Sequence, residues 1–300
     1  MLAIAQFYLS AIVLMLPLLS CVGIGVFWGK RDLPFGGAFI TTLVTSVTTP
    51  ALVFHTFVTT HLDDRALADV AAATLLALLL CALVCALLLK LGRLPVRTLL
   101  PTAFLPNAGN LGLPISQLAF GDAGLSVAVA FFAVNSFVMH TIAVRLLPGV
   151  NTKGSWKSPI LLASVVAVAM RMLHIPVPAW LIETARMLGA VTVPLMLLSL
   201  GHALALIPAN GVRDGAKVAA MRLVTGLGAG LAIVWILDLE PVLAGALTLQ
   251  MAMPCAVVSY MYAKRYTDMG DTAAGAVLVS TVVFLLLAPL MLWLSRAAGM

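Results

Sequence analysis

The stretch that decides the fold is FLPNAGNLGLPISQ, residues 104–117. It places two prolines, two glycines and two asparagines in the middle of an apolar segment long enough to cross a bilayer. Proline lacks a backbone donor and biases the residue before it away from helix, so Pro106, Gly109, Gly112 and Pro114 predict an interrupted span. In hydrocarbon, freed backbone groups are tolerated only where protein or a water-filled cavity satisfies them. The stretch therefore predicts a site inside the membrane.

The rest of the chain has the composition of an integral membrane protein. Of its 300 residues 62% are hydrophobic and 9% charged, with a mean hydropathy of +1.13, whereas soluble domains average about 25% charged residues. The net charge of +6 does not indicate nucleic-acid binding, because the basic residues lie in short loops. No basic residue precedes the first apolar run, which continues past Cys21, so we expect a retained span and not a cleaved signal.

Hydropathy predicts an all-α protein with ten membrane spans. The expected spans are residues 4–28, 34–60, 66–89, 98–120, 123–147, 158–175, 178–206, 214–237, 241–263 and 271–296. The connections between them are too short to hold a further domain, so we expect one integral membrane domain.

The basic residues predict the orientation of these spans. If the N-terminus is outside, the cytoplasmic side holds thirteen of the 17 basic residues: Lys30, Arg31, Lys90, Arg93, Arg97, Arg145, Lys153, Lys157, Arg213, Lys217, Arg222, Lys264 and Arg265. The outer side keeps Arg65, Arg171, Arg186 and Arg296. By the positive-inside rule, both termini are expected to be extracytoplasmic in a cell inner (plasma) membrane.

A weak internal repeat divides the chain. Pro50 in VTTPAL has a counterpart in Pro194 in VTVPLM, and Pro106 has one in Pro254, each pair separated by about half the chain. Because five spans per half is an odd number, the second half is expected to be inverted. Residues 1–150 and 151–300 are therefore predicted as two inverted repeats, with the binding site between the broken helices of spans 4 and 9.

The interruptions supply the chemistry of that site. A second half-helix that starts near Pro114 directs its free amides toward the membrane centre, and Pro254 is expected to offer the amides of residues 255–258 in the same way. With Asn107 and Asn110 between them, these ends form a neutral site rich in hydrogen-bond donors. Such a site suits a carboxylate, because amides solvate the anion without a fixed cation that would trap it.

The segment PNAGNLGLP at 106–114 resembles the glycine–asparagine crossover of the auxin efflux carrier family, whose bacterial members include malonate transporters. TPALVF at 49–54, VPLMLLSLGHAL at 193–204 and MPCAVVSYMYAKRY at 253–266 resemble further spans of that family in the same order. The resemblance implies the ten-helix inverted-repeat fold of bile-acid symporters and sodium/proton antiporters, with a static part, a mobile part and a homodimer. It also implies that Asn107 and Asn110 face the substrate and that Pro106 and Pro254 mark the crossover.

The chain departs from the family in two places. Only about ten residues, 148–157, link spans 5 and 6, where plant members have a long hydrophilic loop. Pro254 has no adjacent asparagine or charge, so we expect Ser259 and Tyr260 to assist the backbone there, with Gly109 and Gly112 on the opposite segment. Auxin itself is therefore a poor default substrate.

Other polar residues inside the spans have two interpretations each. His55, His140 and His202 are candidates for coupling or gating, or neutral histidines bonded to carbonyls. Asn135 and Gln250 are candidates for the same roles, although hydrogen bonding between helices is the commoner one. Glu183 and Arg186 are spaced to pair with each other. Cys81 and Cys85 share a helix face without a histidine or carboxylate, so packing is expected and no metal site.

These features predict a secondary transporter of small organic anions, mono- or dicarboxylates such as malonate, that needs no cofactor and couples to H⁺ or Na⁺ where uptake requires it. An interior-negative potential of about 100 mV favours export of a monoanion by roughly 2.3 kcal/mol. Three alternatives stay open: an exporter of amino acids or other small polar metabolites on the same fold, an anion channel, and a membrane enzyme. The enzyme is disfavoured because the sequence has no recognisable nucleophile–base pair, metal motif or paired acids.

Overall fold

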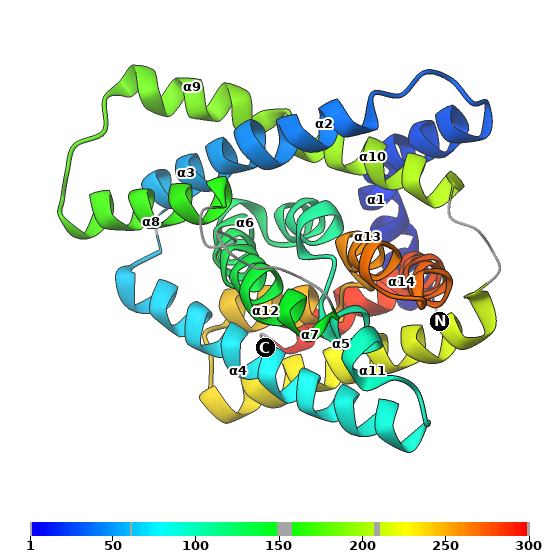
Figure 1. The fold of residues 1–300 in the computed structure, drawn as a ribbon. Helices are drawn as coiled ribbons and strands as arrows, with labels where there is room; N and C mark the ends of the chain where they lie inside the picture. The colour runs from blue at the N-terminus through cyan, green and yellow to red at the C-terminus, as the bar shows by residue number, and fades with distance from the viewer. Residues whose placement is uncertain (1, 61, 149–157, 207–210, 299–300) are drawn as a thin grey trace.

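The computed structural model describes residues 2–60, 62–148, 158–206 and 211–298, and this part of the chain contains helices but no strand (Figure 1). Its helices are listed here in chain order: α1 (Leu2–Lys30), α2 (Gly37–Leu43), α3 (Thr49–Thr59), α4 (Asp64–Leu91), α5 (Val96–Phe104), α6 (Leu113–Phe137), α7 (Val144–Leu146), α8 (Pro159–Met172), α9 (Ala179–Ala190), α10 (Thr192–Leu206), α11 (Val212–Leu237), α12 (Pro241–Ala252), α13 (Val257–Tyr266) and α14 (Gly270–Ala298). Three π-helical turns join some of them: η1 (Val44–Thr48), η2 (Ala108–Gly112) and η3 (Val138–Ala143).

Six helical segments are long and apolar enough to cross a membrane. They are Gly37–Thr59, Asp64–Leu91, Ala108–Leu146, Ala179–Leu206, Val212–Leu237 and Gly270–Ala298, and three shorter apolar helices accompany them, Leu16–Lys30, Pro159–Met172 and Pro241–Ala252. The prediction of a multi-pass, all-α membrane protein is therefore confirmed. The count of ten spans stays a prediction, because several predicted spans are broken into shorter pieces in the structure.

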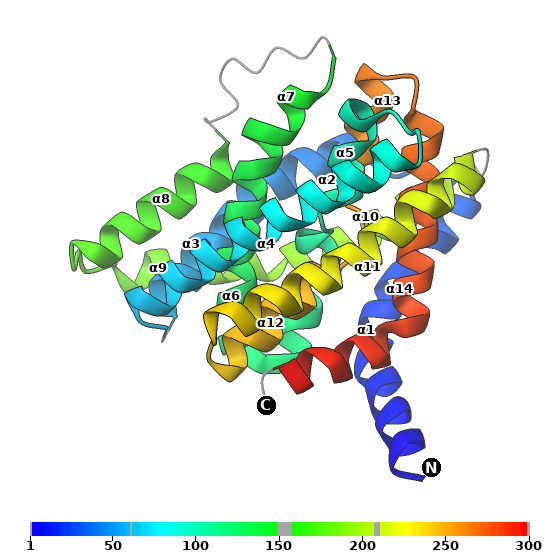
Figure 2. The same ribbon diagram turned by 90° about the horizontal axis from the view of Figure 1, so that it is seen from below.

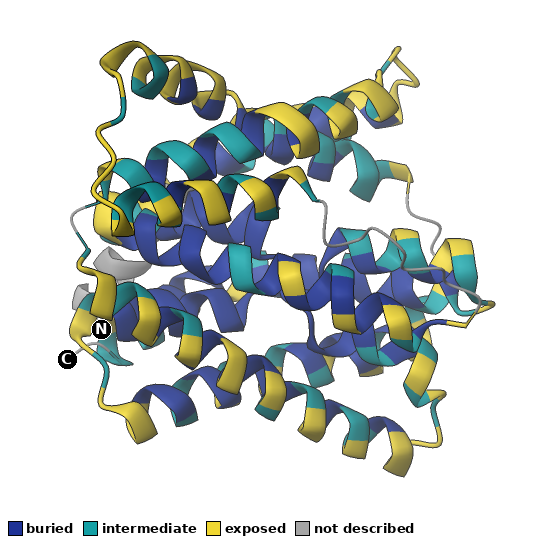
Figure 3. Ribbon diagram, turned by 60° about the vertical axis from the view of Figure 1, so that its left-hand side comes forward, coloured by how far each residue is buried: buried dark blue, intermediate teal, exposed yellow. Residues whose placement is uncertain are grey.

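The boundary between the fourth and fifth predicted spans lies at a break in the helix. Residues 98–120 and 123–147 are expected as two spans, and Gly121 between them has a non-helical, left-handed backbone (φ 65°, ψ −153°), so α6 consists of two helical pieces that meet at a kink. Glycine adopts that backbone without strain. The most apolar stretch of Ala108–Leu146 is 78% buried, more than that of any other candidate span among the described residues, so these residues lie in the interior. Figure 3 shows buried helices at the centre of the molecule and exposed residues around them.

The helices pack as two groups, and the interrupted helices, α5 with α6 and α12 with α13, pack mainly with the second. In the first group α1 packs along α10, and α3 packs against α8 and α9. In the second group α11 packs against α4, α12 and α14, and Figure 2 shows α4 and α11 side by side. Small residues allow the close approach: a Cβ at Gly201 of α10 would overlap the backbone of Val22 in α1.

The prolines of the two related segments lie at equivalent places. Pro50 is in the first turn of α3, directly after η1, and Pro194 is in the first turn of α10, directly after α9 ends at Ala190. Pro50 lies where the π-helical turn η1 passes into α3, and Pro194 follows the single turn residue Val191 between α9 and α10. Each proline lacks the N–H that a continuous helix would use, which accounts for the local irregularity. These positions agree with breaks at matching points of the two halves, while the inversion of the halves stays a prediction.

Candidate functional site

Two interrupted helices meet in the interior at what we call the junction, residues 105–107 and 253–256. The two segments are extended and antiparallel, with a single β-bridge between Pro106 and Cys255. The Asn107 amide donates to the Pro254 carbonyl at 2.8 Å, and the Ala256 amide donates to the Leu105 carbonyl at 3.1 Å. The chain thus pairs the backbone groups that the interruptions release, as the membrane interior requires.

The prolines cause both interruptions through the residue that precedes them. Leu105, before Pro106, ends α5 with φ −81° and ψ 121°, and Met253, before Pro254, ends α12 with φ −58° and ψ 148°. Both are extended conformations, which the proline ring imposes on its predecessor. Pro114 lies in the first turn of α6, as predicted, although helical backbone already begins with η2 at Ala108.

A fully buried arginine closes the junction on one side. Arg222 of α11 is 0% exposed, and its guanidinium donates to the carbonyl of Phe104 at the end of α5 and to those of Met251 and Met253 at the end of α12. Its Nη1 also lies 3.3 Å from the Cys81 thiol. Buried charges require partners of this kind, and the arginine fork can serve several carbonyls at once.

This position corrects the expectation that Arg222 is one of the cytoplasmic loop cations. Hydropathy places the ends of a span only approximately, so the sequence alone does not distinguish a buried arginine within a helix from one near a loop. The charge asymmetry that predicts the orientation still holds without it. Two other residues of that set, Lys153 and Lys157, lie outside the described residues.

Two glycines of α11 provide a test of this packing. A Cβ at Gly226 would overlap the Met251 carbonyl and the Arg222 guanidinium, whereas a Cβ at Gly228 would meet nothing within 4 Å. We expect Gly226→Ala to lower the melting temperature of the purified protein strongly, because the backbone of α12 cannot yield without breaking the junction. Gly228→Ala is the matched control and is expected to be neutral or stabilising by up to about 1 kcal/mol from helix propensity. Equal melting temperatures for the two variants would contradict the close packing at Gly226.

On the other side of the junction lies a cavity of about 370 Å³, here called the junction cavity. It separates the two helix groups and is lined by these residues: Thr41, Val44, Thr45, Thr49, Pro106, Asn107, Ala108, Gly109, Asn110, Phe132, Asn135, Ser136, Met139, His140, Ile160, Met196, Ser199, Leu200, Ala203, Ala256, Val257, Val258, Met261 and Tyr262. All three π-helical turns contribute to its wall. Such turns occur frequently at functional sites, and no residue pattern in the sequence predicts them.

The wall of this cavity contains buried polar atoms that have no partner. They are the Asn107 Nδ2, the Asn135 Oδ1, the Ser136 hydroxyl and the Thr49 hydroxyl, on residues that are at most 5% exposed. Each such atom costs about 1–3 kcal/mol when it stays unpaired. Native proteins rarely leave several together unless water or a ligand completes them. The junction cavity is therefore the strongest candidate for a polar ligand.

The predicted glycines have different roles. Gly109 lines the junction cavity beside Asn110, and a Cβ there would press on the ring of Phe132. Gly112 does not line it, since a Cβ at Gly112 would overlap the side-chain amide of Gln250. Gln250 is fully buried and donates from Nε2 to the Ser116 hydroxyl at 3.2 Å. It therefore bridges α12 and α6, which is the helix-to-helix role given above as the commoner one.

The residues that follow Pro254 differ most from the expectation in which of their groups are free to face the cavity. The amides of Cys255 and Ala256 are already bonded, to the Ser280 hydroxyl and the Leu105 carbonyl. Ser259 donates to the Ala256 carbonyl at 2.6 Å, and neither it nor Tyr260 is among the residues that line the cavity. Residues 257, 258, 261 and 262 of α13 line it instead. The rotation of α13 decides which side chains face the cavity.

The histidines are divided among three environments. His140 lines the junction cavity, with its Nδ1 3.0 Å from the Tyr262 hydroxyl. His202 stacks on Phe35 with ring centroids 4.0 Å apart and lines neither cavity described here. His55 lines a second cavity. A role in coupling is therefore proposed below for His140 alone among them.

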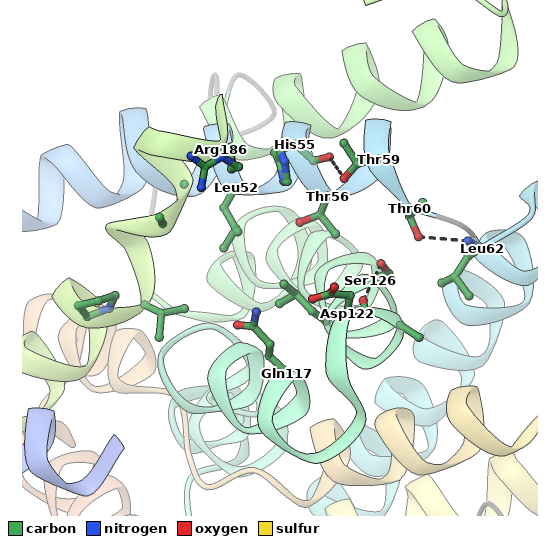
Figure 4. A pocket seen from close by; sticks show the side chains of 16 residues that line it. Leu52, His55, Thr56, Thr59, Thr60, Leu62, Gln117, Asp122, Ser126 and Arg186 are labelled. Atoms are coloured by element: carbon green, nitrogen blue, oxygen red, sulfur yellow. Dashed lines mark hydrogen bonds between the residues drawn. The ribbon is translucent and has the colours of Figure 1, made fainter. Parts of the chain in front are cut away.

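The second cavity, of about 720 Å³, is larger than the junction cavity. Figure 4 shows Gln117, Asp122 and Ser126 of α6 facing His55 and Thr56 of α3, with Arg186 of α9 at its edge. Several of its polar groups have local partners: Thr59 donates to the His55 carbonyl and Ser126 to the Asp122 carbonyl. Size alone therefore does not identify the site.

The charge at the edge of the second cavity is also paired. Arg186 and Glu183 form a bidentate ion pair with contacts of 2.8 and 2.6 Å, which confirms the pairing predicted from their spacing. Both side chains are more than half exposed, so this pair adds little to stability. The unpaired buried atoms, and not the larger volume, distinguish the junction cavity.

A family model described as a membrane transport protein matches residues 10–157 and 149–292. The chain belongs to this family, that of the auxin efflux carriers. No curated protein matches the sequence. Because the family consists of membrane transporters, the junction cavity of this transporter is a candidate transport site.

Proposed function

We propose that this auxin efflux carrier family member is a secondary active transporter of small organic anions, mono- or dicarboxylates such as malonate, with the substrate in the junction cavity. The observation that carries the proposal is the group of unpaired, buried polar atoms on the cavity wall. Three of them, on Asn107, Ser136 and Thr49, can donate hydrogen bonds. Each of these atoms is closed off from the cavity in this conformation, so its side chain has to turn toward the cavity before an anion can accept its hydrogen bond and remove the cost of leaving it unpaired.

The two cavities support transport by alternating access. Both lie between the two helix groups and use opposite ends of shared segments: residues 41–49 line the junction cavity and residues 52–60 the second cavity. The same division holds along α6 after its kink at Gly121, where residues 132–136 face the first cavity and residues 122–126 the second. Relative movement of the groups would open one side while closing the other.

The proposal includes the arrangement inferred from the sequence. We place ten spans in two inverted repeats, residues 1–150 and 151–300, in the inner (plasma) membrane, with both termini outside. A homodimer is expected, and His140 with Tyr262 is the candidate for coupling transport to protons. Among the described residues that line the junction cavity none is Asp or Glu, so coupling to Na⁺ would depend on carbonyl and side-chain oxygens.

The proposal is tested by a thermal-shift screen of the detergent-purified protein against a panel of carboxylates, with and without sodium and across pH. We expect stabilisation by at least one acid and its loss in Asn110→Ala, because Asn110 lines the cavity without contributing to the junction backbone pairs. A ligand present at 100 times its dissociation constant adds about 2.7 kcal/mol to the free energy of unfolding.

Two results would contradict the proposal in different ways. Stabilisation by amino acids and by no carboxylate would favour the exporter of amino acids on the same fold. In liposomes, flux that does not saturate and shows no counter-exchange would indicate a channel. The expected result for a carrier is saturable exchange that Asn110→Ala reduces.

A further inference from the structure

The turn between α4 and α5 carries three cations within eight residues, Lys90, Arg93 and Arg97. All three are exposed, and none forms an ion pair or a side-chain hydrogen bond within the part of the chain that the structure describes. The sequence has no Asp or Glu between Asp69 and Asp122. In Figure 2 the turn lies at the opposite end of the molecule from the start of α1 and the end of α14. The turn is therefore a basic surface whose charge is not neutralised locally.

The length of α4 places these cations at the level of the lipid headgroups. Residues 70–89, twenty in all, contain no charged side chain. A helix of this length spans about 30 Å, which is the thickness of the hydrocarbon core. Asp69 therefore lies near one interface and Lys90 near the other.

Exposed apolar side chains continue from the cations toward the membrane interior. Leu83, Leu87 and Leu91 of α4 are 61%, 56% and 70% exposed. Residues four positions apart lie on the same face of a helix, so these three side chains form a leucine stripe that ends beside Lys90. An acyl chain that covers the leucine stripe has its headgroup at the level of the cations.

Helix α11 lies beside the same turn. A Cβ at Gly92 would lie 3.8 Å from the terminal methyl group of Met221, so the end of α4 is close to this part of α11. Lys217 is one turn before Met221 on the same helix face, and its ammonium group pairs with Asp214 at 2.7 Å. That pair adds no net charge, so the positive charge of the surface comes from the three cations of the turn.

The backbone at Arg93 gives a separate indication that its side chain has a function. The Arg93 amide donates to the Lys90 carbonyl at 3.1 Å and the Leu94 amide to the Leu89 carbonyl at 2.9 Å, which is the Schellman ending of a helix. Arg93 has a left-handed φ of 54° at the position where such endings usually have glycine. The other non-glycine residues with positive φ in the described ranges are of types that tolerate this region: Asp32, His174 and Asp238. The backbone alone therefore does not account for an arginine here.

We propose that the α4–α5 turn binds an anionic phospholipid, with the headgroup phosphate on Lys90, Arg93 and Arg97 and an acyl chain along the leucine stripe. Basic residues immediately outside a membrane helix attract anionic lipids, and the planar fork of arginine matches the phosphate oxygens. A lipid suits the surface better than a soluble anion, because it also covers the leucine stripe. In the orientation proposed above, the site lies in the cytoplasmic leaflet. It goes beyond the proposed transport function, since none of the three cations lines either cavity.

The test measures how strongly the detergent-purified protein prefers dioleoyl phosphatidylglycerol over dioleoyl phosphatidylcholine. These lipids have the same acyl chains and differ in net charge, and native mass spectrometry counts each one bound from an equimolar mixture. Each cation near an anionic surface contributes about a fivefold factor, so we expect the wild type to prefer the anionic lipid about a hundredfold. Arg93→Gly should lower this preference about fivefold. The triple variant Lys90→Gln, Arg93→Gly, Arg97→Gln should remove it.

A matched control removes the same charge elsewhere on the proposed cytoplasmic side. The control variant is Lys30→Gln, Arg31→Gln, Lys264→Gln, near the ends of α1 and α13, and it should keep the preference for phosphatidylglycerol. Melting temperatures measured without lipid check that each variant folds. Arg93→Gly should be at least as stable as the wild type, because glycine adopts the left-handed backbone without strain.

Three results would overturn the proposal. The first is equal binding of the two lipids by the wild type. The second is an equal loss of preference in both triple variants, because overall charge would then explain the attraction. The third is displacement of phosphatidylglycerol by millimolar inorganic phosphate, which would indicate a site for the free ion and not for a lipid. A loss confined to the variants of the α4–α5 turn, with no effect of phosphate, is the expected result, and none of these outcomes bears on substrate binding in the junction cavity.

Discussion

Replacing Arg222 by methionine is expected to prevent the protein from accumulating in a folded, monodisperse form. The side chain is fully buried and donates to three carbonyls, those of Phe104, Met251 and Met253. Methionine has a similar length but no donors, so these carbonyls lose the guanidinium in a region from which lipid and protein exclude water. Each orphaned acceptor costs about 1–3 kcal/mol, which together exceeds the effect of most single substitutions.

The measurement is size-exclusion chromatography of a fluorescent fusion, before and after heating. Lys217→Met is the matched control on the same helix, because Lys217 is about half exposed and pairs with Asp214 at the surface, where an ion pair contributes at most about 1 kcal/mol. Arg222→Lys should have an intermediate effect, since an ammonium keeps the charge but not the planar fork. If Arg222→Met were as stable as Lys217→Met, the structural role of Arg222 would be excluded.

Replacing Asn107 by aspartate is expected to abolish anion binding while changing the side-chain shape very little. Asn107 is 5% exposed, lines the junction cavity and has an unpaired Nδ2. Aspartate has a negatively charged carboxylate oxygen in place of that N–H donor. Two like charges about 4 Å apart repel by roughly 4 kcal/mol at an effective dielectric constant of 20, which corresponds to about a thousandfold loss of affinity.

Binding is measured by calorimetry with the acid that gives the largest thermal shift. Asn107→Ala removes the donor without adding charge and should lower the affinity for the anion about tenfold, in line with the loss of one hydrogen bond to a charged group. Gln117→Glu adds the same charge to the second cavity and should leave the equilibrium affinity nearly unchanged. If the aspartate variant bound the anion as well as the wild type, the substrate would not lie beside Asn107.

The two cavities also show why chemistry, and not volume, identifies a candidate site. The second cavity is about twice as large, at about 720 Å³ against 370 Å³. Its serine and threonine hydroxyls near the edge are bonded to nearby backbone, and its arginine is paired with Glu183. The smaller cavity has buried groups that still need partners. A large, locally satisfied space is more consistent with an entrance than with a binding site.

The sequence by itself determined the membrane class, most helix positions and the interruption at the junction. Composition decides the membrane class, because a chain with 9% charged residues has too few of them to form the surface of a water-soluble protein. Pro106 and Pro254 decide the interruption at the junction through a local effect on the preceding residue. Leu105 and Met253 are therefore extended, as expected. The asparagines of the same segment follow directly, and Asn107 and Asn110 do line the cavity.

Only the tertiary structure decided which other side chains belong to the site. The contact between Arg222 and Phe104 joins residues 118 positions apart, so no local pattern could distinguish this cation from those in loops. The rotation of α13 about its axis directs Tyr262 to the cavity and Ser259 to the Ala256 carbonyl. That rotation depends on the packing of α13 against α14 and α5. Local backbone preferences act over a few residues and can be read along the chain, whereas the orientation of a side chain depends on partners that folding brings together.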